Sequence, residues 1–463
     1  MKILLLTTVL AAQGGGMLNL PSDYMSAETR AEIQAELDVN RALLRSQGKL
    51  EPVKSGIVTF DWPLAAASWL DDPGVHGISN FVDQDPAFPN QLLDYNCGAR
   101  SYDLSNGYNH RGIDFFTWPY GWKRMDEFGV EIVAIADGTI LSKFDGNDDR
   151  SCGFGGGSWN AVYVEHSDGS IAWYGHMKNG STTSKAIGES VVAGEYLGIV
   201  GSSGSSTGPH LHLEVYDGQG QLIEPYAGAC NVMNASSWWT QQRAYYDSAL
   251  NRLEIASAPP DFPACPQAET SHERRVFSTA ETMYYIAFYR DQLAGQNTNY
   301  KLYRPDNSVL YDWLHSSPEP HYAASYWYWF WDLAGQPTGT WTWEATYQGQ
   351  TEQRQFELVA PGNGDNDGFM DHLDNCMTVA NPSQLDSNGD GYGNACDADI
   401  NDDGIVNFAD LNQLKLAMFS AVGDANWNPA ADFDGSGTIN FVDLLTMKTQ
   451  FFGAPGPSAY APL

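Results

Sequence analysis

Gly208-Pro-His-Leu-His-Leu-Glu-Val215 is the stretch that decides the fold expected for this chain. Apolar residues alternate with polar ones from Leu211 to Val215, and this period of two predicts a β-strand. Side chains two residues apart lie on the same face of a strand. His210 and His212 are therefore expected to point in the same direction.

Two further segments carry histidines, Asn109-His-Arg-Gly-Ile-Asp114 and Tyr174-Gly-His176. A catalytic zinc site takes three protein ligands and leaves one position for water. The H-x-x-x-D and H-x-H clusters can supply those three ligands and leave two histidines for proton transfer. Gly112 and the apolar residues after it argue against a helix, so the two ligands of the first cluster should flank a turn into a strand.

These motifs, together with the segments 132–138 and 198–201, resemble the lysostaphin-type (beta-lytic) zinc metallopeptidases over about residues 95 to 230. The resemblance implies one catalytic zinc ion held by His110, Asp114 and His212. It also implies that His176 and His210 serve catalysis. An insertion-like stretch, 145–159, departs from the family pattern and leaves the shape of the groove open.

Two alternatives concern the same region. His166 lies on another strand-like run and is interpreted as a core histidine rather than a ligand. The segment Gly204-Ser-Ser-Thr-Gly208 matches the G-x-S-x-G pattern of serine hydrolases, which requires a strand before it and a helix after it. Pro209 and an alternating strand pattern follow instead, so we interpret the segment as a flexible loop leading to His210.

Composition restricts the function classes. The 463 residues suffice for about three domains, and the formal net charge of −33 disfavours nucleic-acid binding, which needs Lys and Arg. The first residues read as a short secretory signal, and no stretch is long enough for a membrane span. We therefore expect a secreted or cell-surface protein, bacterial, with the periplasm as an alternative.

Six cysteines suit an oxidising compartment. Cys376 and Cys396 bracket one small acidic module and are expected to pair. The other four allow three pairings, and the spacing does not choose among them: Cys97, Cys152, Cys230 and Cys265.

The expected fold class is multidomain and mainly β, with a β-sheet zinc peptidase domain, a β-sandwich-like domain and small α/loop calcium-binding modules. Residues 26–47 read as an amphipathic helix capped by Ser26 that braces the catalytic domain or belongs to a pro-segment. The aromatic run Tyr326–Trp331 is assigned to the sandwich core, with sugar stacking as the alternative. The expected boundaries are 1–15 (signal), 16–94 (helical/extended), 95–258 (peptidase), 268–360 (sandwich), 363–397 and 398–452 (calcium modules) and 453–463 (flexible tail).

The last hundred residues repeat one calcium template, D-x-[DN]-x-[DN]-G with a carboxylate at the twelfth position. Its four copies predict about four structural calcium ions. The predicted ligands are Asn363, Asp365, Asp367 and Asp374; Asp386, Asn388, Asp390 and Asp397; Asp399, Asn401, Asp403 and Asp410; and Asp432, Asp434, Ser436 and Asp443. The first two copies resemble a thrombospondin type 3 repeat. The last two resemble a dockerin, which implies a cohesin-like docking partner; a calcium-stiffened stalk without a partner is the alternative.

The sequence thus predicts a secreted zinc metalloendopeptidase that cuts peptide crosslinks of bacterial peptidoglycan. A protease for glycine-rich extracellular proteins is one alternative. A non-catalytic, calcium-dependent adhesion or scaffold protein is the other.

Overall fold

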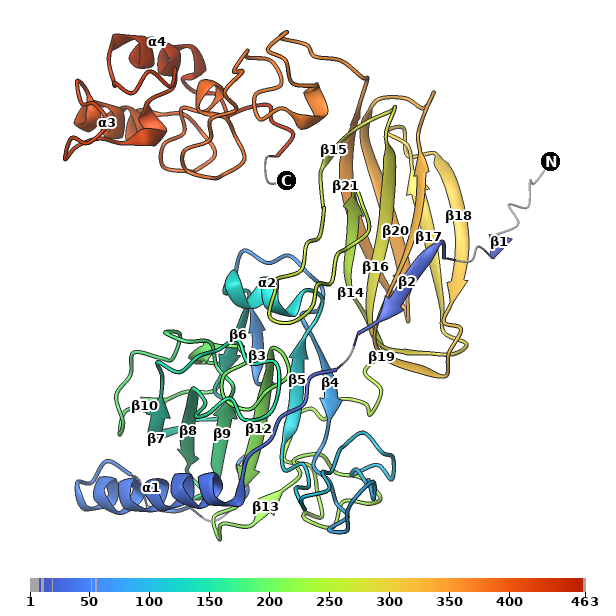
Figure 1. The fold of residues 1–463 in the computed structure, drawn as a ribbon, viewed down its shortest axis with the longest axis vertical. Coiled ribbons are helices and arrows are strands. Elements are labelled where there is room, and N and C mark those ends of the chain that lie inside the picture. The colour runs from blue at the N-terminus through green and yellow to red at the C-terminus, as the bar shows by residue number, and fades with distance from the viewer. Residues whose placement is uncertain (1–7, 10–11, 19, 51, 55, 461–463) are drawn as a thin grey trace.

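A computed structural model of the chain describes residues 8–460 except 10, 11, 19, 51 and 55. The expected fold class is confirmed, because the chain is mainly β and is built from several units. Figure 1 shows a first unit with α1 along its lower edge, a β-sandwich beside it and a tail with two short helices. Among the described residues, no helix is long and apolar enough to cross a membrane.

The first unit is built on one twisted sheet with the strand order β10-β7-β8-β9-β12-β5-β4, and β13 pairs with β12. A smaller sheet has the order β11-β6-β3. The strands of the larger sheet are β4 (His76–Asn80), β5 (Ile113–Thr117), β7 (Gly138–Phe144), β8 (Ala161–His166), β9 (Ile171–Gly175), β10 (Ser190–Val191), β12 (His210–Tyr216) and β13 (Leu222–Ile223). The others are β3 (Leu64–Ala66), β6 (Val130–Val133) and β11 (Tyr196–Ile199), and a short helix is α2 (Gly121–Asp126).

Both faces of the larger sheet are covered, which explains why all six residues of β8 are buried. One face packs into a core with the smaller sheet, and Leu211 and Leu213 of β12 belong to it. The other face is covered in part by α1 (Ala27–Ser46), which buries Ile33, Leu37 and Leu44. Each such side chain contributes about 1.5–3 kcal/mol when removed from water. The predicted helix is present, and the Ser26 side chain accepts from the Thr29 N–H as a cap.

The second unit is a two-sheet β-sandwich. Its larger sheet contains β1 (Thr8–Val9), β15 (Val276–Ser278), β17 (Asn297–Tyr303), β18 (Val309–Ser316), β20 (Gly339–Tyr347) and β21 (Gln350–Val359). The smaller sheet contains β2 (Gly14–Met17), β14 (Ala249–Ala256), β16 (Thr282–Leu293) and β19 (His321–Asp332).

The aromatic run of β19 is divided between two packed faces. Trp329 is fully buried in the sandwich core, where Trp327 and Trp331 also pack. Tyr326 and Tyr328 point the other way and pack beside the contact with the first unit. The assignment of this run to packing therefore accounts for its aromatic residues, and of the six only Phe330 counts as exposed, at 39%.

The contact between the two units is also aromatic. Trp118 is fully buried there and donates from its indole N–H to the Tyr289 carbonyl at 2.9 Å. Phe288 packs edge-on against the same indole, with ring centroids 5.7 Å apart. The first unit is thus held against one face of the smaller sandwich sheet.

Strand pairing does not follow every expected boundary. β3 and β4 lie in the range 16–94, yet β4 pairs with β5 and β3 pairs with β6 in the first unit. β14 lies in the range 95–258, yet it pairs with β16 of the sandwich. Most of the expected signal segment 1–15 lies outside the described residues, and its described part contains β1 and the start of β2.

Three disulfides use all six cysteines. The predicted Cys376–Cys396 bond is present. Of the three pairings open for the other cysteines, the structure has Cys97–Cys230 and Cys152–Cys265. The second bond ties the insertion-like stretch 145–159 of the first unit to the loop between β14 and β15 of the sandwich.

The tail has little regular structure. Its helices are α3 (Phe408–Ala417) and α4 (Phe441–Gln450), and three single turns of 3-10 helix are η1 (Asp371–Leu373), η2 (Asn394–Cys396) and η3 (Pro429–Ala431). Asn407 and Asn440 cap the two α-helices with identical capping boxes, and Asp410 and Asp443 complete them. The two capping boxes occupy the same positions in the third and fourth calcium templates.

Candidate metal centre

Strand register brings the histidine motifs together. β12 lies between β5 and β9, so that His212 is opposite Asp114 on one side and Gly175 on the other. His210 and His212 are both fully buried on the same face of β12, as the period of two predicts. His176 directly follows β9, and the left-handed backbone at this residue (φ 62°) turns the chain at the end of the strand.

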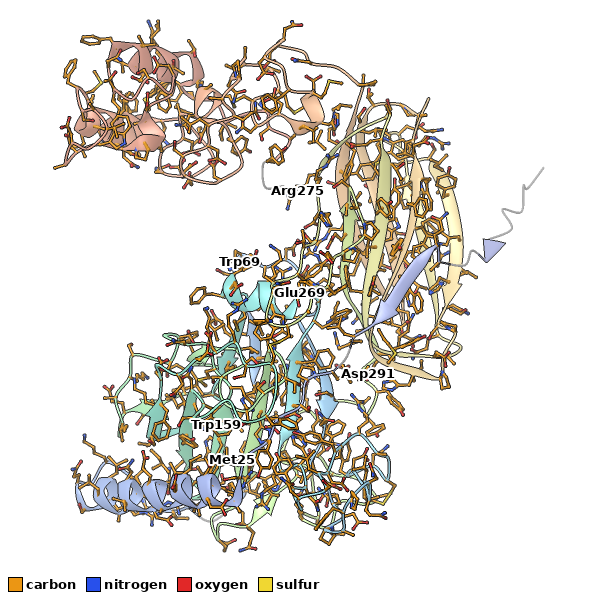
Figure 2. The ribbon with its side chains drawn as sticks, in the orientation of Figure 1. Met25, Trp69, Trp159, Glu269, Arg275 and Asp291 are labelled. Carbon is orange, nitrogen blue, oxygen red and sulfur yellow. A yellow bond between two sulfur atoms is a disulfide. The ribbon has the colours of Figure 1, made fainter. Side chains whose placement is uncertain are left out.

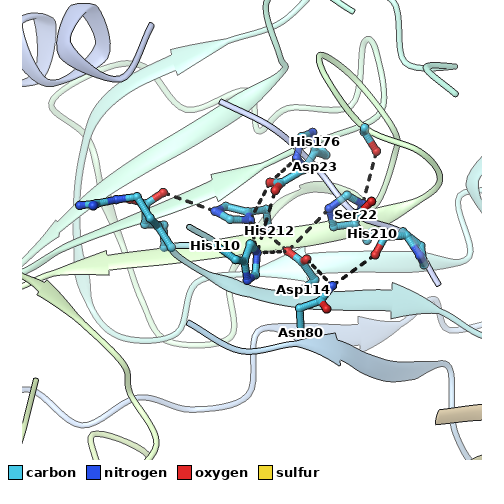
Figure 3. A network of polar contacts seen from close by, with 12 residues as sticks. Ser22, Asp23, Asn80, His110, Asp114, His176, His210 and His212 are labelled. Carbon is cyan, nitrogen blue, oxygen red and sulfur yellow. Dashed lines mark hydrogen bonds and ion pairs between the residues drawn. The ribbon is translucent and has the colours of Figure 1, made fainter. Parts of the chain in front are cut away.

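The three residues expected to bind zinc converge on one point (Figure 3). Asp114 Oδ1 lies 3.0 Å from His110 Nε2 and 3.0 Å from His212 Nδ1. The two histidine nitrogens are 3.3 Å apart. All three side chains are almost completely buried. Two imidazoles and a carboxylate in this arrangement match the nitrogen and oxygen donors that zinc prefers.

Outer contacts fix which atoms face the metal position. His110 Nδ1 lies 2.8 Å from the Phe81 carbonyl, which accepts a hydrogen bond from the Nδ1–H and leaves the lone pair of Nε2 for a metal. His212 Nε2 lies 3.4 Å from Glu214 Oε2, which leaves Nδ1 free. The Asn80 amide donates to Asp114 Oδ2 at 3.0 Å. Such contacts orient metal ligands and set their tautomers.

Glu214 is itself part of a buried polar network. Arg30 of α1 forms an ion pair with its carboxylate, and the Tyr216 hydroxyl donates to it. Burial raises the pKa of Glu214, but the Arg30 guanidinium, the hydrogen bond with His212 and the charge of Arg111 together hold it below its ordinary value, so the carboxyl stays ionised. The helix that covers the sheet therefore also supports the metal centre.

Gly112 is required by the close approach of two strands. A Cβ atom at this position would lie 2.6 Å from the His212 ring and 2.8 Å from the Leu213 carbonyl oxygen. A larger residue would push the ligand out of place. Gly112, which argued against a helix in the sequence, is thus also needed for the position of the His212 ring.

His176 and His210 form a second pair beside the ligands, with ring centroids 4.5 Å apart. His176 Nδ1 lies 2.6 Å from the Ser203 carbonyl, and His210 Nδ1 lies 2.8 Å from the Gly208 carbonyl. In both rings Nε2 faces the metal position. Among the described residues, His210 Nε2 has no hydrogen-bond partner. Burial and the neighbouring His176 lower the pKa of His210 to about 4, so this imidazole is neutral near pH 7.

The sequence missed one residue of the centre, Asp23. Its carboxylate is buried at 2% exposure and lies 2.8 Å from His212 Nδ1 and 3.1 Å from His176 Nε2. Asp23 is therefore close to both the ligand group and the second histidine pair. No motif marks it, because it belongs to the segment before α1, 87 residues ahead of His110 in the chain.

A cleft of about 580 Å³ opens beside His176. Trp159 and Met25, which lie close together in Figure 2, form part of its wall. Trp159 comes from the insertion-like stretch and packs edge-on against His176, with centroids 5.1 Å apart. The stretch that departs from the family pattern thus shapes the groove next to a predicted catalytic residue.

The structure decides the two alternatives that concern His166 and Ser206. His166 is buried away from the centre and contacts the Asp137 carbonyl at 2.9 Å, as a core histidine does. Ser206 of the G-x-S-x-G match is followed by β12 and by no helix, so the nucleophile elbow is absent. Its hydroxyl donates to the Gly208 carbonyl at 3.0 Å.

The predicted calcium ligands gather most clearly in the first and fourth copies, where three carboxylates each lie close together. In the first copy, Asn363, Asp365 and Asp374 each have a buried oxygen without a partner among the described residues. Burial raises the pKa of Asp374. Unpaired buried oxygens are costly without a cation, so this loop fits a calcium ion. The other two copies show no such group of carboxylates among the described residues.

Comparison with known families agrees with this geometry. Residues 108–225 match the model of Peptidase family M23. The resemblance to the lysostaphin-type metallopeptidases is confirmed. Residues 363–384 and 385–412 match the thrombospondin type 3 repeat, which confirms that resemblance as well. The second match includes the third calcium template, and the dockerin-like resemblance of 398–452 stays a prediction.

Several of the similar proteins are peptidases by name. The chain is 41% identical over 120 residues to the DD-carboxypeptidase/endopeptidase Mpg of Neisseria meningitidis serogroup B, covering 26% of this chain and 23% of that protein. It is 36% identical over 119 residues to the glycyl-glycine endopeptidase ALE-1 of Staphylococcus capitis, covering 25% and 27%. The catalytic domain of lysostaphin from Staphylococcus simulans aligns at 27% identity with a TM-score of 0.20, covering 27% of this chain and 83% of that chain. The chain spans about a quarter of the length of the curated relatives it matches.

Proposed function

We propose that the protein is a secreted zinc metalloendopeptidase that hydrolyses peptide bonds in bacterial peptidoglycan crosslinks. The observation that carries the proposal is the convergence of His110, Asp114 and His212 beside a second pair, His176 and His210, within a stretch that matches Peptidase family M23. The names of the two similar peptidases support a peptide bond as the target.

The residues of the centre have separate tasks. His110, Asp114 and His212 would hold the zinc ion. When bound there, a zinc ion would lower the pKa of a bound water and polarise a carbonyl group. His210 is neutral and has an unpaired Nε2, so it is suited to accept a proton from the attacking water. His176 faces the same space and can stabilise the oxyanion or protonate the leaving amine. The position of both rings beside the candidate ligands supports a catalytic role for each of them.

The tail would act as a calcium-dependent module outside the cell. The two thrombospondin type 3 matches and the unpaired oxygens of the first loop support calcium binding there. A stretch that carries fifteen Asp and a single Lys between residues 365 and 443 repels itself without cations. A cohesin-like docking partner for residues 398–452 is part of this proposal and rests on the sequence resemblance alone.

The direct test compares two substrates with the zinc-loaded chain. Purified peptidoglycan and a glycine-rich protein are incubated for hours with the native chain and with a His210→Ala variant, and newly released amino groups are counted. We expect release from peptidoglycan by the native chain, a rate at least a hundredfold lower for the variant, and the same zinc content in both. Release from the glycine-rich protein alone would replace the peptidoglycan assignment. No release from either substrate would favour a scaffold protein.

A further inference from the structure

One segment, residues 202–208, holds the Nδ1 atoms of both histidines that are proposed to transfer protons. The Ser203 carbonyl lies 2.6 Å from His176 Nδ1, and the Gly208 carbonyl lies 2.8 Å from His210 Nδ1. A carbonyl oxygen only accepts hydrogen bonds, so each ring carries a proton on Nδ1 and directs Nε2 toward the metal position. The position of this segment therefore decides where both Nε2 atoms lie.

The segment lies outside the strands of the sheet and is supported by the insertion-like stretch 145–159. The Ser151 N–H donates to the Ser202 carbonyl at 3.0 Å, and the Gly153 N–H donates to the Ser206 carbonyl at 2.8 Å. The Ser202 hydroxyl donates in return to the Ser151 carbonyl at 2.9 Å. These bonds attach the stretch to the segment at two points four residues apart.

Glycines allow the stretch and the segment to approach each other closely. A Cβ atom at Gly156 would lie 1.9 Å from the Gly204 carbonyl oxygen. A Cβ atom at Gly204 would lie 2.8 Å from Trp159 Cβ, and the φ of Gly204 is 74°, which also favours glycine. Gly204 is the first glycine of the G-x-S-x-G match. This packing against the stretch therefore accounts for that glycine without a nucleophile.

The Cys152–Cys265 bond fixes the stretch at the point of contact. Cys152 lies between Ser151 and Gly153, the two residues that donate to the segment. Cys265 Sγ lies 3.9 Å from the Ser151 carbonyl oxygen and 4.0 Å from the Thr207 carbonyl oxygen, so it also contacts the segment directly. The stretch contains no strand or helix of its own. A covalent link to the sandwich loop therefore limits its movement where the segment needs support.

We propose that the Cys152–Cys265 bond and the stretch that it fixes are positioning elements for His176 and His210. They act through the carbonyl groups of the segment and not on the reacting atoms. The proposal rests on the proposed function, because the position of the two rings matters for turnover only if they transfer protons. A displacement of about 1 Å can lower turnover about 100-fold, so a loosened segment should reduce turnover while the zinc ligands stay in place.

The first experiment removes the bond from the full, zinc-loaded chain. The variant Cys152→Ser/Cys265→Ser is compared with Cys97→Ser/Cys230→Ser, which removes a disulfide within the first unit that does not contact the segment. Amide hydrogen exchange, read by mass spectrometry of the peptide 202–210, measures how often the segment opens. We expect at least tenfold faster exchange of this peptide in the first variant, native exchange in the second, and one zinc ion in both.

The second experiment disturbs the same contact and leaves every cysteine in place. The methyl group of Gly156→Ala would meet the Gly204 carbonyl oxygen, so the stretch and the segment must move apart. Gly153→Ala is the matched control in the same stretch, because its Cβ would meet no atom within 4 Å. Gly156→Ala should raise the exchange rate of the segment at least tenfold, and Gly153→Ala should leave it unchanged.

Turnover of soluble, crosslinked peptidoglycan fragments separates positioning from a general loss of stability. The cysteine variant of the stretch and Gly156→Ala should both lower kcat at least tenfold, with KM within about threefold of the native value. Both controls should keep the native kcat.

Several outcomes would overturn the proposal: native exchange of the segment in both test variants, an equal fall of kcat in the controls, or loss of zinc from the test variants. Faster exchange in the test variants with retained zinc, in a protein whose native chain hydrolyses no peptide, would support the structural link between stretch and segment. That result would count against the proposed function instead.

Discussion

Replacing Glu214 with Gln tests how far the metal centre depends on residues outside the ligand set. The carboxylate lies 3.4 Å from His212 Nε2 and forms the buried ion pair with Arg30. An amide keeps the shape but removes the charge that fixes the His212 tautomer. Loss of such an outer contact typically weakens metal binding by about 10- to 100-fold, or about 1.4–2.7 kcal/mol.

The same change has a second effect on stability. The Arg30 side chain is 15% exposed and Glu214 is fully buried, so the variant leaves a largely buried guanidinium unpaired. Breaking a buried pair costs about 3–5 kcal/mol, and the partial exposure of Arg30 places the expected loss near about 3 kcal/mol. Zinc affinity is measured by competition with a chromogenic chelator at pH 7, and stability by urea unfolding of the metal-free chain.

Arg30→Gln is the matched control, because it breaks the same ion pair from the other side. Glu214 then keeps its contacts with Arg111 and Tyr216 and still faces His212. We expect a comparable loss of stability with zinc affinity within about threefold of the native chain. Native zinc affinity in Glu214→Gln, or an equal loss in both variants, would refute the role of Glu214 in orienting His212.

Three further predictions concern other parts of the chain. Burial raises the pKa of Glu224 to about 8 from the ordinary 4.5. Between pH 4.5 and 8 the folded state therefore holds a proton that the unfolded state releases. The free energy of unfolding should fall in this range by up to about 1.4 kcal/mol per pH unit. Glu224→Gln should flatten that dependence in urea unfolding; an unchanged slope would contradict the assignment. A Cβ at Gly112 would lie 2.6 Å from the His212 ring. Gly112→Ala should therefore lower zinc affinity at least tenfold in the chelator assay. Native zinc affinity in this variant would show that the strands can separate without cost. Calcium removal from an isolated 363–463 fragment should change its circular dichroism and expose it to proteases except around the Cys376–Cys396 bond; an identical spectrum with and without calcium would reject the calcium sites.

The sequence predicted where the candidate ligands lie on their strand because that placement depends on local rules, and their binding of a metal stays a prediction. A period of two puts His210 and His212 on one strand face, and the structure has that strand at His210–Tyr216. Helical spacing and Ser26 predicted α1 to within a residue at each end. These features follow from backbone geometry over a few residues, which the sequence states directly.

Domain boundaries were harder to place, because strands join a sheet by pairing across long stretches of chain. β14 follows the first unit without a break in composition, yet it pairs with β16. β4 precedes the histidine motifs, yet it pairs with β5. The hydrophobic pattern of a segment predicts that it forms a strand, but it does not predict which other strand it pairs with.

The sequence by itself determined which side chains are available for chemistry in this protein: the candidate donor atoms for a metal, the histidines beside them and the oxygen-rich loops of the tail. Only the tertiary structure decided what surrounds that chemistry. Asp23 meets His176 across 153 residues, Arg30 meets Glu214 across 184, and four cysteines adopt one of three pairings. The entropic cost of closing a long loop rises slowly with loop length, so it does not select one distant partner over another. Such contacts therefore depend on how whole units pack. Packing and complementary charge select the partner, and they exist only in the folded chain.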